Sequence, residues 1–147
     1  MSPPELLGWV VFALPLLSFL SIGLFFKPWP RLCGYITIGA IGGSFLLSLY
    51  VFGQVLAHPD HSLDTRRWPW LTVGNIQLDL GITLDSLSAV MLLVVTTVSL
   101  LVQIYSQGYM HGDPGYSRYF AFMSLFTASM LGLVLSSSLV MIYIFWE

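Results

Sequence analysis

Charged residues are scarce in this sequence. Lys, Arg, Asp and Glu make up 8% of its 147 residues, whereas 56% of the residues are hydrophobic. A soluble domain carries roughly a quarter charged residues, so this chain lacks the polar surface that water requires. The net charge of -2 also provides no basic surface for nucleic acid. The composition therefore predicts an integral membrane protein that contacts the lipid bilayer and binds no nucleic acid.

Residues for cofactor binding are scarce as well. The one cysteine, Cys33, excludes an internal disulfide and a cysteine cluster for an iron–sulfur centre. The sequence also has no Gly-x-Gly-x-x-Gly motif for a dinucleotide. His58 and His61 are three residues apart, but a proline separates them and further ligands are missing, so a solvated loop is the better interpretation. We therefore expect no cofactor in this chain.

Long apolar runs predict the membrane-spanning helices. About 20 helical residues cross the hydrocarbon core of a bilayer. Four runs reach that length or approach it, and a fifth begins after Ser136-Ser137-Ser138 and is incomplete at the end of the chain. The third run also carries Thr96, Thr97, Ser99 and Gln103, which can bond to the backbone or to neighbouring helices. The predicted fold is all-α, with transmembrane helices over residues 6–26, 32–56, 84–104, 120–135 and 139–147.

The connections predict a small hairpin and an orientation. Short alternating runs on both sides of Gly74-Asn75 indicate a β-hairpin outside the membrane, between the second and third helices. The short loops carry Lys27, Arg31 and Arg118, and basic short loops favour the cytoplasmic side. The N-terminus and the hairpin are therefore expected outside.

Glu147 is the main candidate for a functional residue, because it follows an apolar run directly. A carboxylate in the hydrocarbon region is costly and often marks an ion or proton pathway. The alternative is a residue at the lipid–water boundary with no function. A helix that stops within an apolar run leaves carbonyl groups unsatisfied in lipid, so we expect this chain to be the front part of a longer protein.

Two further charged residues have simpler interpretations. Asp85 precedes the third helix, where a carboxylate can cap the first amides and complement the helix dipole. Capping is the first interpretation, and a role in proton transfer is the alternative. Arg118 lies next to a glycine-rich polar loop, where a structural role at the helix end is expected.

Four segments in order resemble one family of membrane proteins. The sequence resembles the N-terminal part of the largest antiporter-like membrane subunit of respiratory complex I (the NuoL/NdhF type), which is related to the large subunit of multisubunit Na+/H+ antiporters. The resemblance is carried by LDSLSAVML at 84–92, IYSQGYM at 104–110, DPGYSRYFA at 113–121, and SMLGLV at 129–134 continuing to YIFWE at 143–147.

The resemblance implies a proton-translocating subunit of an NADH (or ferredoxin) quinone oxidoreductase. In that family the glutamate of the Phe-Trp-Glu motif, matched by Glu147, takes part in proton transfer and pairs with a lysine on a later helix. Iron–sulfur clusters, flavin and quinone would belong to partner subunits, and the neighbours would include another antiporter-like subunit. The expected location is the bacterial plasma membrane, with the thylakoid or mitochondrial inner membrane as alternatives. A multisubunit Na+/H+ antiporter subunit and a structural or assembly protein are the alternative functions.

Overall fold

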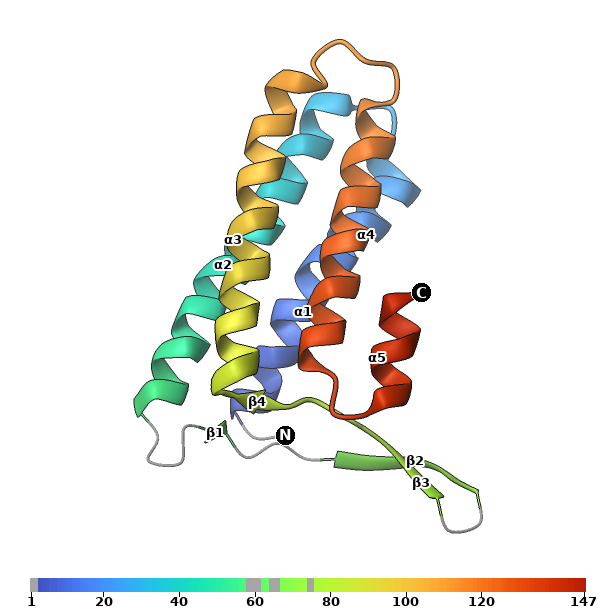
Figure 1. Ribbon diagram of the computed structural model, residues 1–147. Helices are drawn as coiled ribbons and strands as arrows, with labels where there is room; N and C mark the ends of the chain where they lie inside the picture. The colour runs from blue at the N-terminus through green and yellow to red at the C-terminus, as the bar shows by residue number, and fades with distance from the viewer. Residues whose placement is uncertain (1–2, 58–61, 64–66, 74–75) are drawn as a thin grey trace.

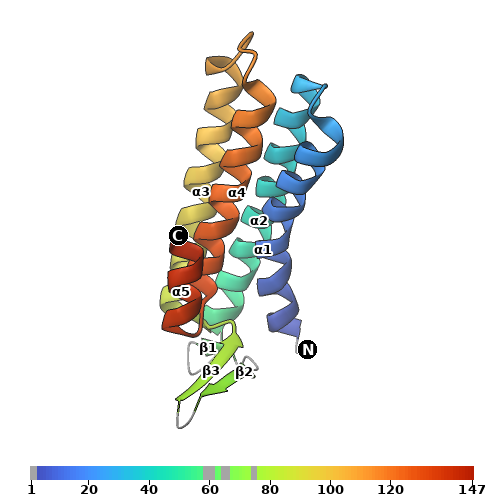
Figure 2. The ribbon, with the colours of Figure 1, turned by 90° about the vertical axis from the view of Figure 1, so that its right-hand side faces the viewer.

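The chain forms a bundle of four long helices with a fifth, shorter helix beside it (Figures 1 and 2). The computed structural model describes residues 3–57, 62–63, 67–73 and 76–147. Four helices are long and apolar enough to cross a membrane, which confirms the predicted all-α membrane fold. The elements are α1 (Pro3–Ser21), a π-helical segment (Ile22–Phe26), α2 (Pro30–Ala57), β1 (Ser62–Leu63), β2 (Arg67–Val73), β3 (Ile76–Gly81), β4 (Leu84–Asp85), α3 (Ser86–Tyr109), α4 (Tyr116–Leu135) and α5 (Leu139–Trp146).

Helix α3 differs most from the predicted ranges. It begins at Ser86, because Leu84 and Asp85 form β4, and it continues past residue 104 to Tyr109. The polar residues beyond residue 104 resemble a loop in sequence, but Ser106 is bonded both within the helix and to α4. The Ser106 hydroxyl donates to the Val102 carbonyl oxygen at 2.7 Å and lies 2.9 Å from the hydroxyl of Tyr119. The next helix, α4, likewise starts at Tyr116 rather than at residue 120.

The predicted hairpin is present as strands β2 and β3. They pair in antiparallel register, with Val73 opposite Ile76, and an irregularity interrupts the register between Pro69 and Leu71. The Gly74-Asn75 turn itself lies outside the described residues, as do His58 and His61. The hairpin and the N-terminus lie at one end of the bundle, and the short α1–α2 and α3–α4 connections lie at the other (Figure 1).

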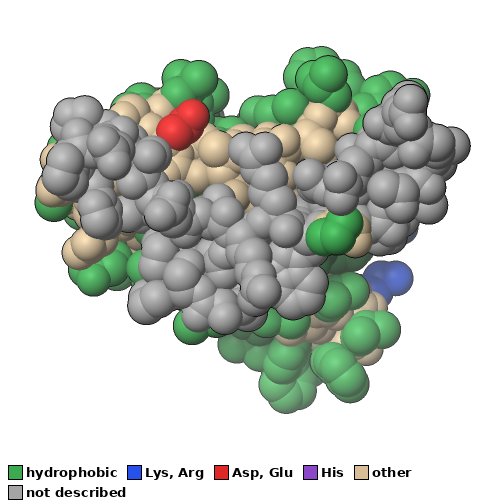
Figure 3. Space-filling view, turned by 90° about the horizontal axis from the view of Figure 1, so that it is seen from below, with side chains coloured by type: hydrophobic (Ala, Val, Ile, Leu, Met, Phe, Trp, Pro, Cys, Tyr) green, Lys and Arg blue, Asp and Glu red, His purple; other side chains and the backbone are tan. Residues whose placement is uncertain are grey.

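The outside of the bundle is apolar along its length. Large side chains such as Leu46, Leu101 and Phe126 are exposed on different helices. A view from the hairpin end likewise shows hydrophobic side chains around the rim of the described surface, with few charged ones among them (Figure 3). Since exposed apolar surface on this scale marks contact with lipid or with partner proteins, the outer faces fit a membrane environment.

The interior of the bundle changes character along its length. At the hairpin end, apolar side chains from α1, α2, α3 and α4 form a cluster that includes Val11, Val55, Leu92 and Leu135. Toward the other end, many buried positions hold hydroxyl or amide groups, beside a second, smaller apolar cluster of Ile22, Cys33 and Ala121. The buried polar residues of the described chain are Ser18, Thr37, Ser44, Ser48, Ser88, Thr96, Ser99, Gln103, Ser106, Ser117, Ser124 and Thr127, of which Ser88 lies at the hairpin end.

Candidate functional site

The turn between α4 and α5 determines where the last helix starts. The Ser138 hydroxyl accepts a bond from the Met141 amide and caps α5, in agreement with the predicted turn at residues 136–138. The segment before α3 holds this turn in place: the Thr83 amide donates to the Leu135 carbonyl at 2.8 Å, and the Ser137 amide donates to the Gly81 carbonyl at 3.3 Å. Helix α5 therefore starts at the hairpin end and runs back along α4 (Figure 1).

One aromatic contact orients α5 about its own axis. The ring of Phe145 lies directly over Gly132, where a Cβ atom would be only 2.7 Å from two ring carbons. The same ring packs edge-on against Phe12 of α1, with centroids 5.4 Å apart. Met141, one turn earlier on α5, is buried. With this face held against α1 and α4, the direction of the residues that follow Phe145 is set by packing.

Glu147 follows Phe145 by two residues and lines a groove of about 500 Å³. The C-terminal end of α5 lies beside the middle of α4, between the two ends of the bundle (Figure 1). Within this chain the side chain of Glu147 is exposed, so it faces outward from α5 rather than into the four-helix interior. The other groove residues include no basic side chain; they are Phe122, Leu125, Phe126, Ser129, Met130, Leu133, Phe145 and Trp146.

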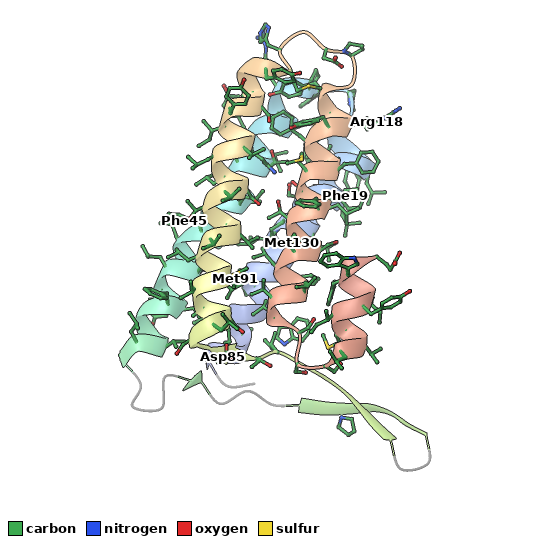
Figure 4. All side chains as sticks on the ribbon, in the orientation of Figure 1. Phe19, Phe45, Asp85, Met91, Arg118 and Met130 are labelled. Atoms are coloured by element: carbon green, nitrogen blue, oxygen red, sulfur yellow. The ribbon has the colours of Figure 1, made fainter. Side chains whose placement is uncertain are left out.

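Asp85 caps α3, as predicted. Its Oδ1 atom accepts a hydrogen bond from the Ser88 backbone amide at 2.7 Å. That bond holds the pKa of the Asp85 carboxyl below its usual value of 3.8, against the opposing effect of partial burial. A carboxylate at the start of a helix is also favoured by the helix dipole. Asp85 lies at the hairpin end of the bundle (Figure 4), whereas the helix that carries Glu147 ends at mid-height.

Arg118 lies in the first turn of α4, at the end of the bundle opposite Asp85, and its side chain is exposed (Figure 4). The structure therefore does not bring the three predicted residues together. Sequence reasoning overlooked the contact that positions Glu147, between Phe145 and Gly132. The signal was a glycine within an apolar helix, one turn before its end, where glycine weakens the helix unless close packing requires it.

Comparison with known families identifies a match in the middle of the chain. Residues 70–120 match the family described as NADH-Ubiquinone oxidoreductase (complex I), chain 5 N-terminus. This range includes the hairpin strand β3, all of α3 and the start of α4.

Curated relatives extend the similarity to nearly the whole chain. The NAD(P)H-quinone oxidoreductase subunit 5 of Angiopteris evecta chloroplasts is 44% identical over 95% of this chain and 19% of its own length. The NAD(P)H-quinone oxidoreductase chain 5 of Picosynechococcus sp. is 41% identical over 100% of this chain and 23% of its own length. The chain thus spans about a fifth of the length of these relatives.

A solved structure has the same arrangement of helices. The structure of the Mrp complex from Dietzia sp. DQ12-45-1b includes a chain that superposes with a TM-score of 0.68 at 28% sequence identity. The match covers 99% of the present chain and 15% of that chain.

Proposed function

Since the chain corresponds to the N-terminal part of the largest antiporter-like membrane subunit of complex I, we propose that it belongs to the proton-translocating machinery of an NADH (or ferredoxin) quinone oxidoreductase. Glu147 is the residue that we assign to proton transfer. The observation that carries this assignment is a carboxylate at mid-height of a membrane bundle, in a groove whose other side chains are apolar except Ser129.

The chemistry of such a carboxylate suits a proton switch. Removal from water favours its neutral form, whereas a nearby cation favours its charged form. The groove that Glu147 lines is open to the outside of this chain, and none of the described residues that line it is basic. A lysine approaching from a later helix of the full-length protein would therefore control whether the carboxyl is protonated. This local charge change can drive a two-state element.

The subunit is proposed to act with partners. Electron transfer would take place in other subunits that hold flavin, iron–sulfur clusters and quinone, and a second antiporter-like subunit would lie beside this one in the membrane. We place the complex in the bacterial plasma membrane. The N-terminus and hairpin face outward, because Lys27, Arg31 and Arg118 occupy the opposite end of the bundle.

The second candidate is the large subunit of a multisubunit Na+/H+ antiporter. The structural match to a chain of the Mrp complex favours it, because identity and fold extend over 99% of the present chain. The curated relatives at 41–44% identity favour the quinone oxidoreductase. Purification of the native complex discriminates between the two. Iron–sulfur subunits that co-purify support the oxidoreductase, and a complex free of redox centres supports the antiporter.

The Glu147→Gln substitution in the full-length protein tests the assignment. We expect proton pumping to fall several-fold while the complex assembles and still reduces quinone, since an amide keeps the shape of the side chain but cannot exchange a proton. Proton uptake by inverted membrane vesicles and the amount of assembled complex are the measurements.

Asp113→Asn is the matched control. Asp113 lies in the α3–α4 loop, where its Oδ1 atom accepts from the Gly115 amide at 2.6 Å, a bond that asparagine can also accept. Pumping should stay at the wild-type level in this variant. Normal pumping by Glu147→Gln at normal complex levels would remove Glu147 from the proton path.

A further inference from the structure

Gln103 is a buried side chain without a hydrogen-bond partner. Its exposed fraction is 0%, and neither Nε2 nor Oε1 has a partner among the described residues. A buried amide that makes no hydrogen bond costs free energy, so natural proteins nearly always satisfy one with protein groups or ordered water. The neighbouring buried hydroxyls are satisfied: Thr96 donates to the Leu92 carbonyl at 2.7 Å, and Thr127 donates to Ser99 at 3.1 Å.

The face of α3 that carries Gln103 is polar above and below it. Thr96, Ser99, Gln103 and Ser106 are all buried, and their spacing of three and four residues places them in one stripe along the helix. Ser99 accepts one bond from Thr127, and Ser106 is 2.9 Å from Tyr119 of α4. A hydroxyl has one hydrogen and two lone pairs, so these groups retain capacity for a further bond.

The stripe lies beyond the apolar core. On α3 the apolar cluster of the interior includes Ala89, Leu92 and Val95, and the polar stripe starts at the next residue. Gln103 lies about 26 Å along α3 from Ser86, at a rise of 1.5 Å per residue, and thus in the half of the bundle away from the hairpin. An apolar cavity stays dry, whereas a polar interior site with two to four partners holds water.

We propose that Gln103 is the centre of a buried water site between α3 and α4. The amide would donate through Nε2 or accept through Oε1, and the hydroxyl of either Ser99 or Ser106, each one turn from Gln103, would supply a further hydrogen bond to the water. Water is the ligand of choice because Gln103 has no surface through which a partner protein or lipid could reach it. The site is independent of the proton-transfer role proposed for Glu147.

A density map of the native complex, at a resolution that shows ordered waters, is the direct test. We expect a water peak about 3 Å from Nε2 or Oε1 of Gln103. The proposal is overturned if waters at the same depth elsewhere in the complex are visible but none contacts Gln103. It is equally overturned if the amide bonds directly to a protein group.

Substitution gives a second, independent measurement. Gln103→Met keeps the length of the side chain and removes both polar atoms. If Gln103 binds water, this variant loses the water peak, and the unfolding temperature of the complex falls because the serine hydroxyl that shares the water with Gln103 loses that bond. If the amide is simply unsatisfied, the unfolding temperature rises instead, which overturns the proposal.

Gln107→Met is the matched control. Gln107 lies one turn further along α3 and is only half-buried. The peak at Gln103 should persist in this variant, and loss of the peak in both variants would show a general change of packing in place of a defined site. If Gln103→Met fails to assemble, the map of the wild-type complex still decides the question.

Discussion

Asp85 shows how a single side chain stabilises the start of a membrane helix. Its carboxylate accepts from the Ser88 amide, which would otherwise lack a partner in the first turn of α3. Replacing Asp85 with alanine should destabilise the folded protein by about 1 kcal/mol. The Asp85→Asn variant should lose less stability than Asp85→Ala, because asparagine is also a good capping residue. Chemical unfolding of the purified protein in detergent measures both, and equal losses would show that the charge matters more than the hydrogen bond.

The same residue predicts a dependence on pH. Because the folded protein holds the pKa of Asp85 below 3.8, the ionised form is the stabilising one. Its contribution is complete above the pKa of the unfolded chain, about 4, and is lost as pH falls through the lower pKa of the folded state. The stability difference between wild type and Asp85→Asn should therefore shrink below about pH 4. A difference that stays constant over this range would contradict the assigned pKa shift.

Asp85 and Gln103 mark the limit of prediction from sequence at this scale. The cap was predictable because donor and acceptor are three residues apart, on one helical turn. Gln103 was recognised in sequence only as a polar group able to bond to the backbone or a neighbouring helix. That its amide has no partner depends on which atoms of α4 and α2 come near it, and sequence spacing does not contain that information.

At the scale of the element, α5 depends on one close contact with α4. A Cβ atom at Gly132 would lie 2.7 Å from the ring of Phe145, closer than carbon atoms in contact approach. Alanine normally stabilises a helix relative to glycine by about 1 kcal/mol, but overpacking costs about 1–3 kcal/mol. Since Phe12 holds the other side of the ring, the clash should dominate. Gly132→Ala should therefore shift α5 and, on the role proposed for Glu147, reduce proton pumping by the full-length protein as is expected of Glu147→Gln.

The matched control is Gly39→Ala on α2, where nothing lies within 4 Å of the added atom. That variant should assemble and pump normally. A second change, Phe145→Leu, should restore much of the pumping to Gly132→Ala by removing the ring that clashes. If Gly132→Ala pumps normally, the position of α5 does not depend on this contact.

The sequence predicted the number of spanning helices more accurately than their boundaries. Hydropathy counts apolar residues, so it predicted four spanning helices correctly, but it ended the third at 104 because polar residues follow. The structure continues that helix to Tyr109 because Ser106 donates to the preceding turn and contacts Tyr119. Hydrogen bonds of Ser106 within α3 and to α4 thus accompany the extension of this helix, and hydropathy averaged over a window does not register them.

At the scale of the whole molecule, the basic residues of the short connections are separated from the hairpin by the length of the bundle. Lys27, Arg31 and Arg118 lie at the end with the short connections, and the hairpin lies at the other (Figure 1). Basic residues in short loops are retained on the cytoplasmic side, so this separation predicts an orientation for the whole chain.

Cysteine labelling of intact cells tests this orientation. His111 in the α3–α4 connection and Pro69 in β2 are both exposed, and each can be changed to cysteine in turn. A thiol reagent that cannot cross the membrane should label Pro69→Cys in intact cells and label His111→Cys only after the cells are opened. The wild-type protein is the control, because its own Cys33 is buried and its thiol donates to the Phe26 carbonyl at 3.1 Å. Labelling of His111→Cys in intact cells would place the basic loops outside. The side of the membrane from which protons would enter any path through Glu147 would then be reversed.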